Sequence, residues 1–363
     1  MAEHRWGYTT GACAAAAAKA ALQVLCGIAE PPPVVCLTFP GGRRHTLPLA
    51  FVRATAGGAE AGVVKDAGDD PDVTHGALVT AHVCWTNGAE MVFRAGEGVG
   101  TVTKPGLSIA PGEPAINSGP RRMIRRALAE VSDRPVQVTI GIAGGRQLAA
   151  KTFNPRLGIE NGLSVLGTTG RVRPFSCAAL RSALVCTLDV AWACGVRAPV
   201  LVPGHIGEQA ARCHLQTTPE QVLEVGNEWG FVLGRLVRYP FERLLLFGHP
   251  GKLAKLADGQ WDTHSARSTS PVAAVRRIAQ PLLAAPLPDS PTTEGVFGAL
   301  APHERRRAAE AVAAAVAAAV AEKIGARWPV AVVLVDMKGG LLGAVGQWQR
   351  WRPRQSPKAA EGA

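Results

Sequence analysis

Four aspartates crowd into seven residues within the segment Val64–Gly76, although the chain carries a formal net charge of +11 at pH 7. They are Asp66, Asp69, Asp70 and Asp72, and Thr74-His75-Gly76 follow them. Carboxylates this close repel one another, so a compact loop needs cationic or hydrogen-bonding partners. Because Asp, Gly and Pro are also ordinary turn formers, a plain surface loop is the alternative. We expect these carboxylates to contact basic groups or backbone N–H groups.

Two glycine-rich stretches and one basic helix are further candidates for binding. Gly96–Gly106 and Gly167–Gly170 would expose backbone N–H groups and let a ligand approach closely, although such runs are often only turns. A helix beginning at Pro120 would carry four arginines on one broad face. The four are Arg121, Arg122, Arg125 and Arg126. That face is either solvated surface or a binding surface on which the arginines pair with carboxylates in a bidentate manner.

The composition of the chain indicates which kind of partner it binds and in which cellular compartment its cysteines lie. The excess of 39 Lys and Arg over 28 Asp and Glu predicts an acidic partner, but no long basic block favours nucleic acid. Eight cysteines without a Cys-x-x-Cys pair argue against structural zinc, and without a signal peptide they indicate reduced cytoplasmic thiols. The Ala-rich runs 14–18 and 311–321 fall short of the ~20 apolar residues that a membrane span needs.

Apolar periodicity predicts the elements that hold the first candidates in place. A helix is expected over 12–25, capped by Thr9 or Thr10, with Gly27 after its end. Strands are expected at 34–39, 46–55, 62–65, 77–85, 91–94 and 136–142. Asn87-Gly88 predicts a hairpin between the fourth and fifth of these strands. The acidic loop should therefore lie between two strands, at one end of a sheet.

The second half of the chain changes to alternating strands and helices. Strands are expected at 163–166, 200–202, 244–247 and 330–335, and helices at 177–193, 219–237 and 302–324. Glycine turns at 167–170, 204–208 and 248–251 follow the first three strands. We expect all three turns on one edge of a doubly wound sheet, where ligands of such sheets bind.

These patterns predict an α/β protein of two domains. An N-terminal α+β domain with a mostly antiparallel sheet is expected over 1–153. A C-terminal Rossmann-like α/β domain is expected over 154–348, with a disordered tail over 349–363.

Several stretches, taken in order, resemble one known family. They are Gly7-Tyr8-Thr9-Thr10-Gly11 with Cys13, Lys65–Gly76, Gly96–Gly106, Pro120–Ile124, Thr152–Gly158, Leu166–Gly170 and Asp262-Thr263-His264-Ser265. The chain resembles the CbiD family of cobalt-precorrin-5B C(1)-methyltransferases from about residue 7 to residue 345. The resemblance implies transfer of a methyl group from S-adenosylmethionine to carbon 1 of cobalt-precorrin-5B, giving cobalt-precorrin-6A in anaerobic cobalamin biosynthesis.

That resemblance assigns roles to the candidate residues. Catalytic candidates are His75, Asp66, Asp72 and His264, with His75 also a candidate axial ligand of the substrate's cobalt. Candidates for holding S-adenosylmethionine are Gly167, Thr168, Thr169 and Gly170 with Glu208, or else Gly96, Gly98 and Gly100. The first of these two sites has the better general argument, because it would lie on the α/β edge. Candidates for the substrate's carboxylates are Arg121, Arg122, Arg125 and Lys104, with Thr9, Thr10 and His249 as further substrate contacts.

The expected partner is an anionic cobalt-tetrapyrrole, with no nucleic acid, no membrane and no metal held by the protein itself. A homo-oligomer and transient contacts with neighbouring pathway enzymes are compatible with this interpretation. The alternative from another class is a non-catalytic protein that binds or carries corrinoid intermediates. Binding of S-adenosylmethionine separates the two, because a carrier has no need of it.

Overall fold

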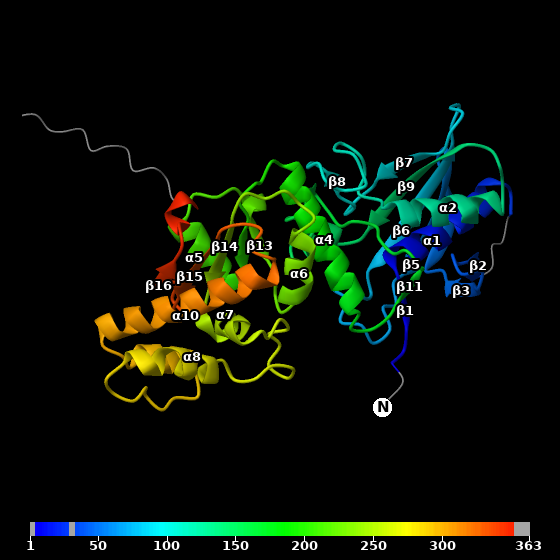
Figure 1. The fold of residues 1–363 in the computed structure, drawn as a ribbon. Coiled ribbons are helices and arrows are strands. Elements are labelled where there is room, and N and C mark those ends of the chain that lie inside the picture. The colour runs from blue at the N-terminus through cyan, green and yellow to red at the C-terminus, as the bar shows by residue number, and fades with distance from the viewer. Residues whose placement is uncertain (1–3, 29–32, 352–363) are drawn as a thin grey trace, which may run out of the picture. The chain divides into compact units, whose positions relative to one another are not determined.

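The protein has a mixed α/β fold of two compact units, which divide between Leu180 and Arg181 (Figure 1). The structure is a computed structural model that describes residues 4–28 and 33–351. We call the two parts unit 1 and unit 2. Residues 154–180, which the sequence had placed with the C-terminal half, pack in unit 1 because two of its short strands pair there. These are β10 (Ile159–Glu160) with β8 (Thr101–Val102), and β11 (Arg171–Val172) with β1 (Gly7–Tyr8).

Unit 1 contains a five-stranded sheet in the order β4-β5-β6-β9-β7. The strands are β4 (Phe51–Thr55), β5 (Gly58–Val64), β6 (Leu78–Trp85), β9 (Val136–Ile142) and β7 (Val92–Ala95). All neighbours are antiparallel except β7 and β9, which are parallel. The predicted hairpin at Asn87-Gly88 is wrong, because β9 lies between β6 and β7. The acidic loop joins β5 to β6, as predicted.

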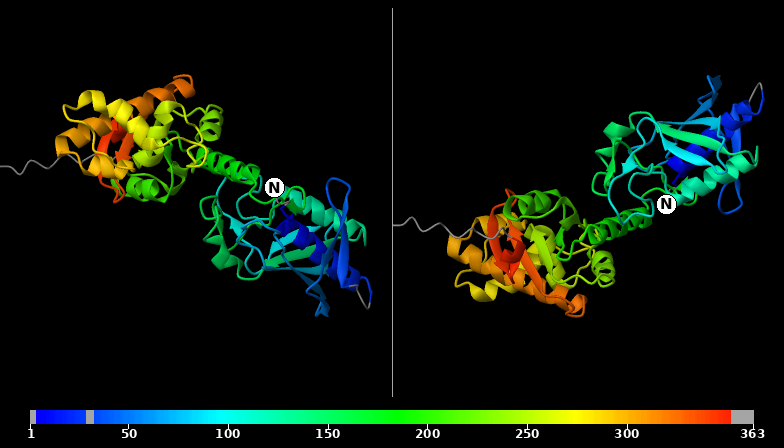
Figure 2. Two further views of the ribbon diagram at one scale, coloured as in Figure 1. Left: turned by 90° about the horizontal axis from the view of Figure 1, so that it is seen from below. Right: turned by 90° about the horizontal axis from the view of Figure 1, so that it is seen from above.

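Helix α1 (Thr10–Leu25) packs against this sheet, with α2 (Ser118–Ala129) beside it (Figure 2). Nine alanine and glycine residues between Gly11 and Ala21 keep α1 narrow, so its N-terminal turns are buried. Thr9 caps the helix by accepting from the Ala12 N–H at 3.1 Å, and Gly27 follows its end with φ of +92°. The remaining elements of unit 1 are the hairpin β2 (Val34–Thr38) and β3 (Arg44–Pro48), and α3 (Gly145–Ala149).

Unit 2 contains a second five-stranded sheet, in the order β13-β12-β14-β15-β16. The strands are β12 (Val200–Val202), β13 (Val222–Glu224), β14 (Leu244–Gly248), β15 (Val330–Val335) and β16 (Leu341–Val345). The first four in spatial order are parallel and β16 is antiparallel. The predicted strand over 163–166 is wrong, since Leu163 and Val165 make only isolated bridges in unit 1. The predicted helix over 219–237 is right only in its second half, where α6 (Trp229–Leu236) lies, because β13 occupies part of its first half. Strand β16 was not predicted from the sequence.

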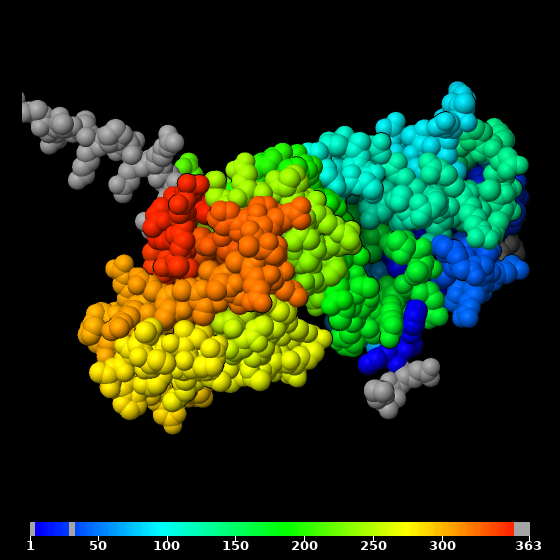
Figure 3. Space-filling model, viewed as in Figure 1, coloured from blue at the N-terminus to red at the C-terminus, as the bar shows by residue number. Residues whose placement is uncertain are grey.

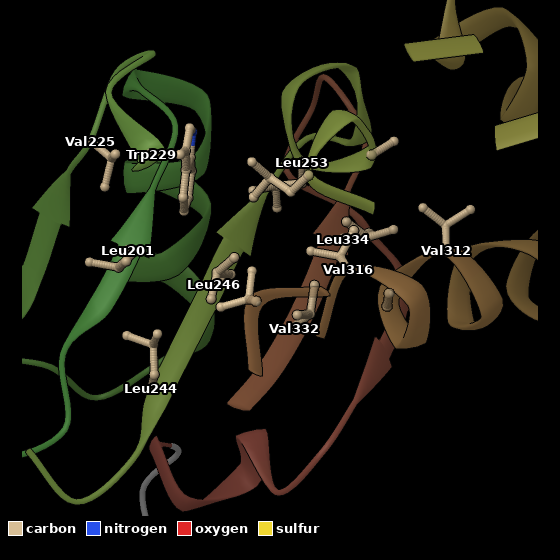
Figure 4. Close-up of a cluster of buried hydrophobic side chains, with 14 of the residues drawn as sticks. Leu201, Val225, Trp229, Leu244, Leu246, Leu253, Val312, Val316, Val332 and Leu334 are labelled. Atoms are coloured by element: carbon tan, nitrogen blue, oxygen red, sulfur yellow. The ribbon is translucent and has the colours of Figure 1, made fainter. Parts of the chain in front are cut away.

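Helices cover the sheet of unit 2 and share its apolar core. They are α4 (Cys177–Ala193), α5 (His205–His214), α6 (Trp229–Leu236), α7 (Pro250–Leu253), α8 (Pro271–Ala279), α9 (Thr293–Gly298) and α10 (Pro302–Lys323). Figure 4 shows Leu201, Leu246 and Val332 on neighbouring strands, with Trp229 of α6 and Val316 of α10 among the side chains of the same core. In Figure 3 the surface of α8 (yellow) adjoins that of α10 (orange), which it contacts.

Short 3₁₀ turns complete unit 2. They are η1 (Pro219–Gln221), η2 (Ala254–Asp258), η3 (Gln280–Leu282) and η4 (Trp348–Trp351). The tail predicted to begin at residue 349 starts inside η4, where Trp351 is buried and donates its indole N–H to the Ala198 carbonyl. Residues 352–363 lie outside the described part of the chain. Among the helices of residues 4–28 and 33–351, none combines the length and the apolar character of a membrane span.

Candidate functional site

A small cavity of about 100 Å³ in unit 1 brings together four stretches that are far apart in the sequence. The start of α1, the acidic loop, the turn after α3 and the segment before the 167–170 turn all line it. Its polar lining residues are Thr9, Thr10, Lys65, Asp72, Thr74, Thr152, Asn154 and Ser164. Six of these are buried, all except Asp72 and Thr152. Buried polar groups gathered around one space are typical of a binding site, and we call this space the polar cavity.

Two charged residues line the polar cavity, Lys65 and Asp72, and they form an ion pair with each other. Lys65 Nζ lies 2.7 Å from Asp72 Oδ2, and the Lys65 side chain is 1% exposed. The other carboxylate oxygen, Oδ1, accepts from the backbone N–H and the hydroxyl of Thr74, at 2.8 and 2.6 Å. Burial raises the pKa of the Asp72 carboxyl, but the Lys65 ammonium and the Thr74 hydrogen bonds outweigh it and hold that pKa below its usual value. Asp72 is therefore a poor general base at neutral pH.

Helix α1 and the 167–170 turn hold the opposite wall. Thr10 Oγ1 accepts from the Leu166 N–H at 3.0 Å, and the Thr9 N–H donates to the Gly170 carbonyl at 3.0 Å. A Cβ on Gly167 would overlap the Thr9 side chain, so this glycine is required by close packing. The turn thus lies in unit 1 and does not belong to the sheet edge of unit 2. The predicted grouping of its residues Gly167, Thr168, Thr169 and Gly170 with two turns of that sheet is wrong.

The other aspartates of the acidic loop have the partners that the sequence predicts. Asp66 accepts two hydrogen bonds from the Arg5 guanidinium, Asp69 accepts from the Arg5 N–H at 2.7 Å, and Asp70 accepts from the Phe175 N–H at 2.8 Å. Hydrogen bonds from Arg5 and from the Gly68 N–H lower the pKa of Asp66 to about 2. All four carboxylates of the acidic loop therefore have hydrogen-bonding or cationic partners within the protein, which hold the loop in a compact form.

The two histidine candidates for a base lie on loops and are exposed. His75 Nδ1 accepts from the Ala67 N–H at 3.1 Å, which leaves Nε2 to carry the ring proton, and the side chain is 56% exposed. In unit 2, His264 Nδ1 accepts from the Ala266 N–H at 3.2 Å. Within residues 4–28 and 33–351, no three His, Cys, Asp or Glu side chains are arranged to hold a metal ion.

The glycines of the 96–100 segment contact the protein's own backbone. A Cβ on Gly98 would overlap the Ile142 carbonyl oxygen, and one on Gly96 would lie 2.9 Å from the Ile140 carbonyl oxygen. A Cβ on Gly100 would lie 2.9 Å from the carbonyl oxygens of the 160–162 turn. Close packing of unit 1 thus explains why these positions are glycine, without invoking a ligand.

The arginines of α2 differ in how far they are free to bind a substrate. Arg121 donates to the Ile116 carbonyl at 2.8 Å and pairs with Glu113 at 2.7 Å. Its guanidinium and that of Arg125 both lie over the Phe93 ring. Arg122 and Arg125 are exposed, whereas Arg121 already serves the fold. The stem of Lys104, in turn, packs close to Gly158.

Unit 2 has its own cavity, of about 310 Å³, at the carboxyl ends of β12 and β14. It is lined by Pro203, Gly204, His205, Ile206, Gly207, His249, Gly251 and Lys252. The chain runs from β12 to β13 on one side and then returns to β14 on the other, so this is the switch point of the parallel sheet. Ligands of open α/β sheets bind at such points. The predicted meeting of the 204–208 and 248–251 turns is confirmed, and we call this space the switch-point cavity.

Charged groups at the switch-point cavity are also held in place. Lys252 Nζ donates to the Pro203 carbonyl at 3.3 Å, and burial lowers its pKa. His249 Nε2 lies 3.1 Å from Glu294 Oε2, and its Nδ1 accepts from the Gly251 N–H. On α5, Glu208 pairs with Arg212 at 2.9 Å.

Several polar residues that line the two cavities were not predicted from the sequence. They are Lys65, Thr74, Thr152, Asn154, Ser164 and Lys252. Lys65 and Thr74 lie beside the aspartates of the acidic loop, and Asn154 lies at the domain boundary that was expected between residues 153 and 154. A polar residue inside an otherwise apolar segment, such as Ser164 between Leu163 and Val165, was the available signal.

Comparison with known proteins places a chain with these features among cobalamin-pathway proteins. Residues 1–174 match the family described as CbiD, and residues 262–346 match the family described as CbiD, C-terminal domain. The chain is 53% identical over 354 residues to the cobalt-precorrin-5B C(1)-methyltransferase of Syntrophotalea carbinolica, which covers 97% of this chain and 100% of that protein. The protein of that name from Pseudomonas aeruginosa is 48% identical over 73% of this chain and 74% of its own length. The chain belongs to the CbiD family.

One solved structure is also similar, a cobalamin biosynthesis protein (cbiD) from Archaeoglobus fulgidus. It is 29% identical, with a TM-score of 0.40, and covers 73% of this chain and 83% of that chain.

Proposed function

We propose that this protein is an S-adenosylmethionine-dependent methyltransferase that methylates carbon 1 of cobalt-precorrin-5B to give cobalt-precorrin-6A, in anaerobic cobalamin biosynthesis. The supporting observation is the 53% identity, over the whole of its length, to a protein that carries the methyltransferase name. Four of the stretches that resemble the family converge on the polar cavity, which supports a binding role for unit 1.

The reaction is a displacement at the methyl carbon of the donor. A bond forms between the ring carbon and the methyl carbon, while the bond from methyl to sulfur breaks. The sulfur keeps the electron pair, so the sulfonium becomes the neutral thioether of S-adenosylhomocysteine. In such a reaction the protein acts mainly by aligning the ring carbon with the methyl group and by excluding water from the site.

We propose the switch-point cavity as the site for S-adenosylmethionine. Its ~310 Å³ lies in the range of small-molecule pockets, whereas the polar cavity, at about 100 Å³, is too small for the whole cofactor. Lys252 supplies a cation for the methionyl carboxylate, and Gly204, which has no side chain, allows close approach of a ligand to the backbone of the lining. On this proposal unit 2 is a Rossmann-like domain, Glu208 acts near the site, and the 167–170 and 96–100 glycines serve packing in unit 1.

The substrate's carboxylates match the basic surface of the chain. Of the candidates on α2, Arg122 and Arg125 are exposed and can reach them, although Arg125 also lies over the Phe93 ring, while Arg121 is held by the Ile116 carbonyl. His75 and His264 are the candidates for moving a proton as the macrocycle rearranges, since both are exposed histidines. A His75→Ala enzyme with unchanged turnover would exclude His75 both as base and as a ligand of the substrate's cobalt.

The decisive experiment is anaerobic incubation with cobalt-precorrin-5B and S-adenosylmethionine carrying a ¹³C-labelled methyl group. The proposal expects the label on carbon 1 and one equivalent of S-adenosylhomocysteine. Folded protein that leaves the ring unlabelled would overturn it. Titration calorimetry with S-adenosylmethionine is the companion measurement, because binding of the tetrapyrrole without binding of the cofactor would indicate a carrier.

A further inference from the structure

The polar cavity of unit 1 holds more hydrogen-bond donors than the protein uses. The Lys65 ammonium has three N–H groups, and Asp72 is its one acceptor among residues 4–28 and 33–351. Asn154 is 6% exposed; its Oδ1 accepts from Ser164 at 3.1 Å, while its Nδ2 meets no acceptor in that same part of the chain. Both residues line the open space of the cavity, so their remaining N–H groups are available to a ligand that brings acceptor atoms.

The remaining walls define the shape of that ligand. Thr9 Oγ1 accepts from the Ala12 N–H as the helix cap, so its hydroxyl proton is a further donor at the cavity. The first N–H groups of α1 add partial positive charge at the same wall. Carbon atoms of Leu163, Leu166 and Val172 line the rest. A small anionic acceptor on a short hydrocarbon stem satisfies all of these surfaces.

We propose that the polar cavity binds one carboxylate arm of the tetrapyrrole, of acetate or propionate type, with Lys65 and Asn154 donating to its oxygens. This inference rests on the proposed function, which supplies a substrate with several such arms. About 100 Å³ accommodates a carboxylate and one or two methylene groups, but no ring. Lys65 and Asn154 are then substrate-binding residues, and Asp72 and Thr74 orient Lys65.

The methionyl end of S-adenosylmethionine also carries a carboxylate, but it fits this cavity less well. Its α-ammonium would enter together with the carboxylate and meet Lys65, a like charge. The one carboxylate in the cavity lining, that of Asp72, is already paired with Lys65. The carboxylate arm of the tetrapyrrole carries no such cation. The hydrogen-bond donors of the cavity therefore favour this arm over the methionyl end of S-adenosylmethionine.

The test is an anaerobic absorbance titration of cobalt-precorrin-5B, without cofactor, into wild-type protein and into Asn154→Asp. This change is nearly isosteric and places a negative charge against the carboxylate. We expect the Kd of the tetrapyrrole to rise at least 10-fold, and the Kd of S-adenosylmethionine from calorimetry to stay unchanged. Lys65→Met should act in the same direction. Exposed controls are Asn87→Asp and Lys151→Met, which should leave both constants unchanged.

Each outcome of the titration decides one point. Unchanged tetrapyrrole binding in folded Asn154→Asp would overturn the inference. A rise confined to the Kd of S-adenosylmethionine would also overturn it, and would assign the cavity to the methionyl carboxylate. The titration needs no turnover, so weakened binding in a protein that transfers no methyl group would leave the inference standing while the proposed function fails.

Discussion

The ammonium of Lys65 and the carboxylate of Asp72 form an ion pair at 2.7 Å, and the Lys65 side chain is almost completely enclosed. Removing one partner of such a pair leaves an uncompensated charge in the interior. We expect Asp72→Ala to lower the free energy of unfolding by about 3 kcal/mol, measured by urea denaturation. Lys65→Met combined with Asp72→Leu should recover most of that loss, because it removes both charges together.

The matched control is the exposed pair of Arg306 and Glu310 on α10, at 2.8 Å. Arg306→Ala should cost far less than Asp72→Ala, since water and salt already screen this pair. Equal losses for Asp72→Ala and Arg306→Ala would contradict the account of Lys65 as a charge that depends on its partner.

Asp66 should contribute to stability in a pH-dependent way. Its pKa is about 2 in the folded protein, against 3.8 for an ordinary aspartate. A depressed folded pKa means that the stabilisation is fully present above pH ~4 and is lost as the pH falls through about 2. The unfolding free energies of wild type and Asp66→Asn should therefore differ at pH 6 and converge toward pH 2. Because the Asp66 side chain is 44% exposed, the difference should stay under ~1 kcal/mol. A constant difference across this range would contradict the prediction.

Gly98 should be required by packing, independently of any cofactor. Its φ is +72°, and a Cβ would overlap the Ile142 carbonyl oxygen. We expect Gly98→Ala to destabilise unit 1 by more than ~3 kcal/mol, combining backbone strain with a steric clash. Gly112 has φ of +90° and open space around its Cβ position, so Gly112→Ala isolates the strain and should cost only ~1–2 kcal/mol. Equal losses would mean that the clash is relieved elsewhere.

Exposed cysteines should react with an alkylating reagent in the native protein, and the buried Cys13 should not. Burial raises the pKa of the Cys13 thiol to about 12, whereas Cys26 and Cys213 are exposed. The thiolate is the reactive form, so iodoacetamide at pH 8 should modify Cys26 and Cys213 in the native protein and spare Cys13. Mass spectrometry should find Cys13 modified only after denaturation in urea. Labelling of native Cys13 would show that α1 opens in solution.

Local signals in the sequence were enough to predict much of unit 1. The Thr9 cap, the alanine-rich helix and the Gly27 terminus describe α1 almost to the residue. The partners of the acidic loop followed from charge repulsion alone. The pairing of β7 did not follow from Asn87-Gly88, because a turn signal cannot reveal that β9, more than 40 residues later, inserts between the two strands.

Local sequence patterns did not predict several features of unit 2 and of the two cavities. The segment 163–166 has the apolar composition of a strand, yet tertiary contacts place it beside α1 in unit 1. Val222–Glu224 is too short for its periodicity to distinguish a strand from a helix. Asn154 and Ser164 meet Lys65 only in three dimensions, and no spacing in the chain encodes that meeting. Residues that bind through convergence of distant segments are therefore those that sequence patterns reveal least.

Lys252 should decide where the methyl donor binds. Its ammonium lines the switch-point cavity, and it is the one lysine of that lining. If the methionyl carboxylate pairs with it, Lys252→Met removes a charge-assisted hydrogen bond worth ~1.5–3 kcal/mol. Calorimetry should then show the Kd of S-adenosylmethionine raised roughly 10- to 100-fold, since about 1.4 kcal/mol is a factor of ten. Lys338→Met is the control, because Lys338 is an exposed lysine of the same unit that lines a different hollow of about 600 Å³. Unchanged affinity in folded Lys252→Met would remove the cofactor from the switch-point cavity. The glycines at 167–170 and 96–100 would then be the next positions to test.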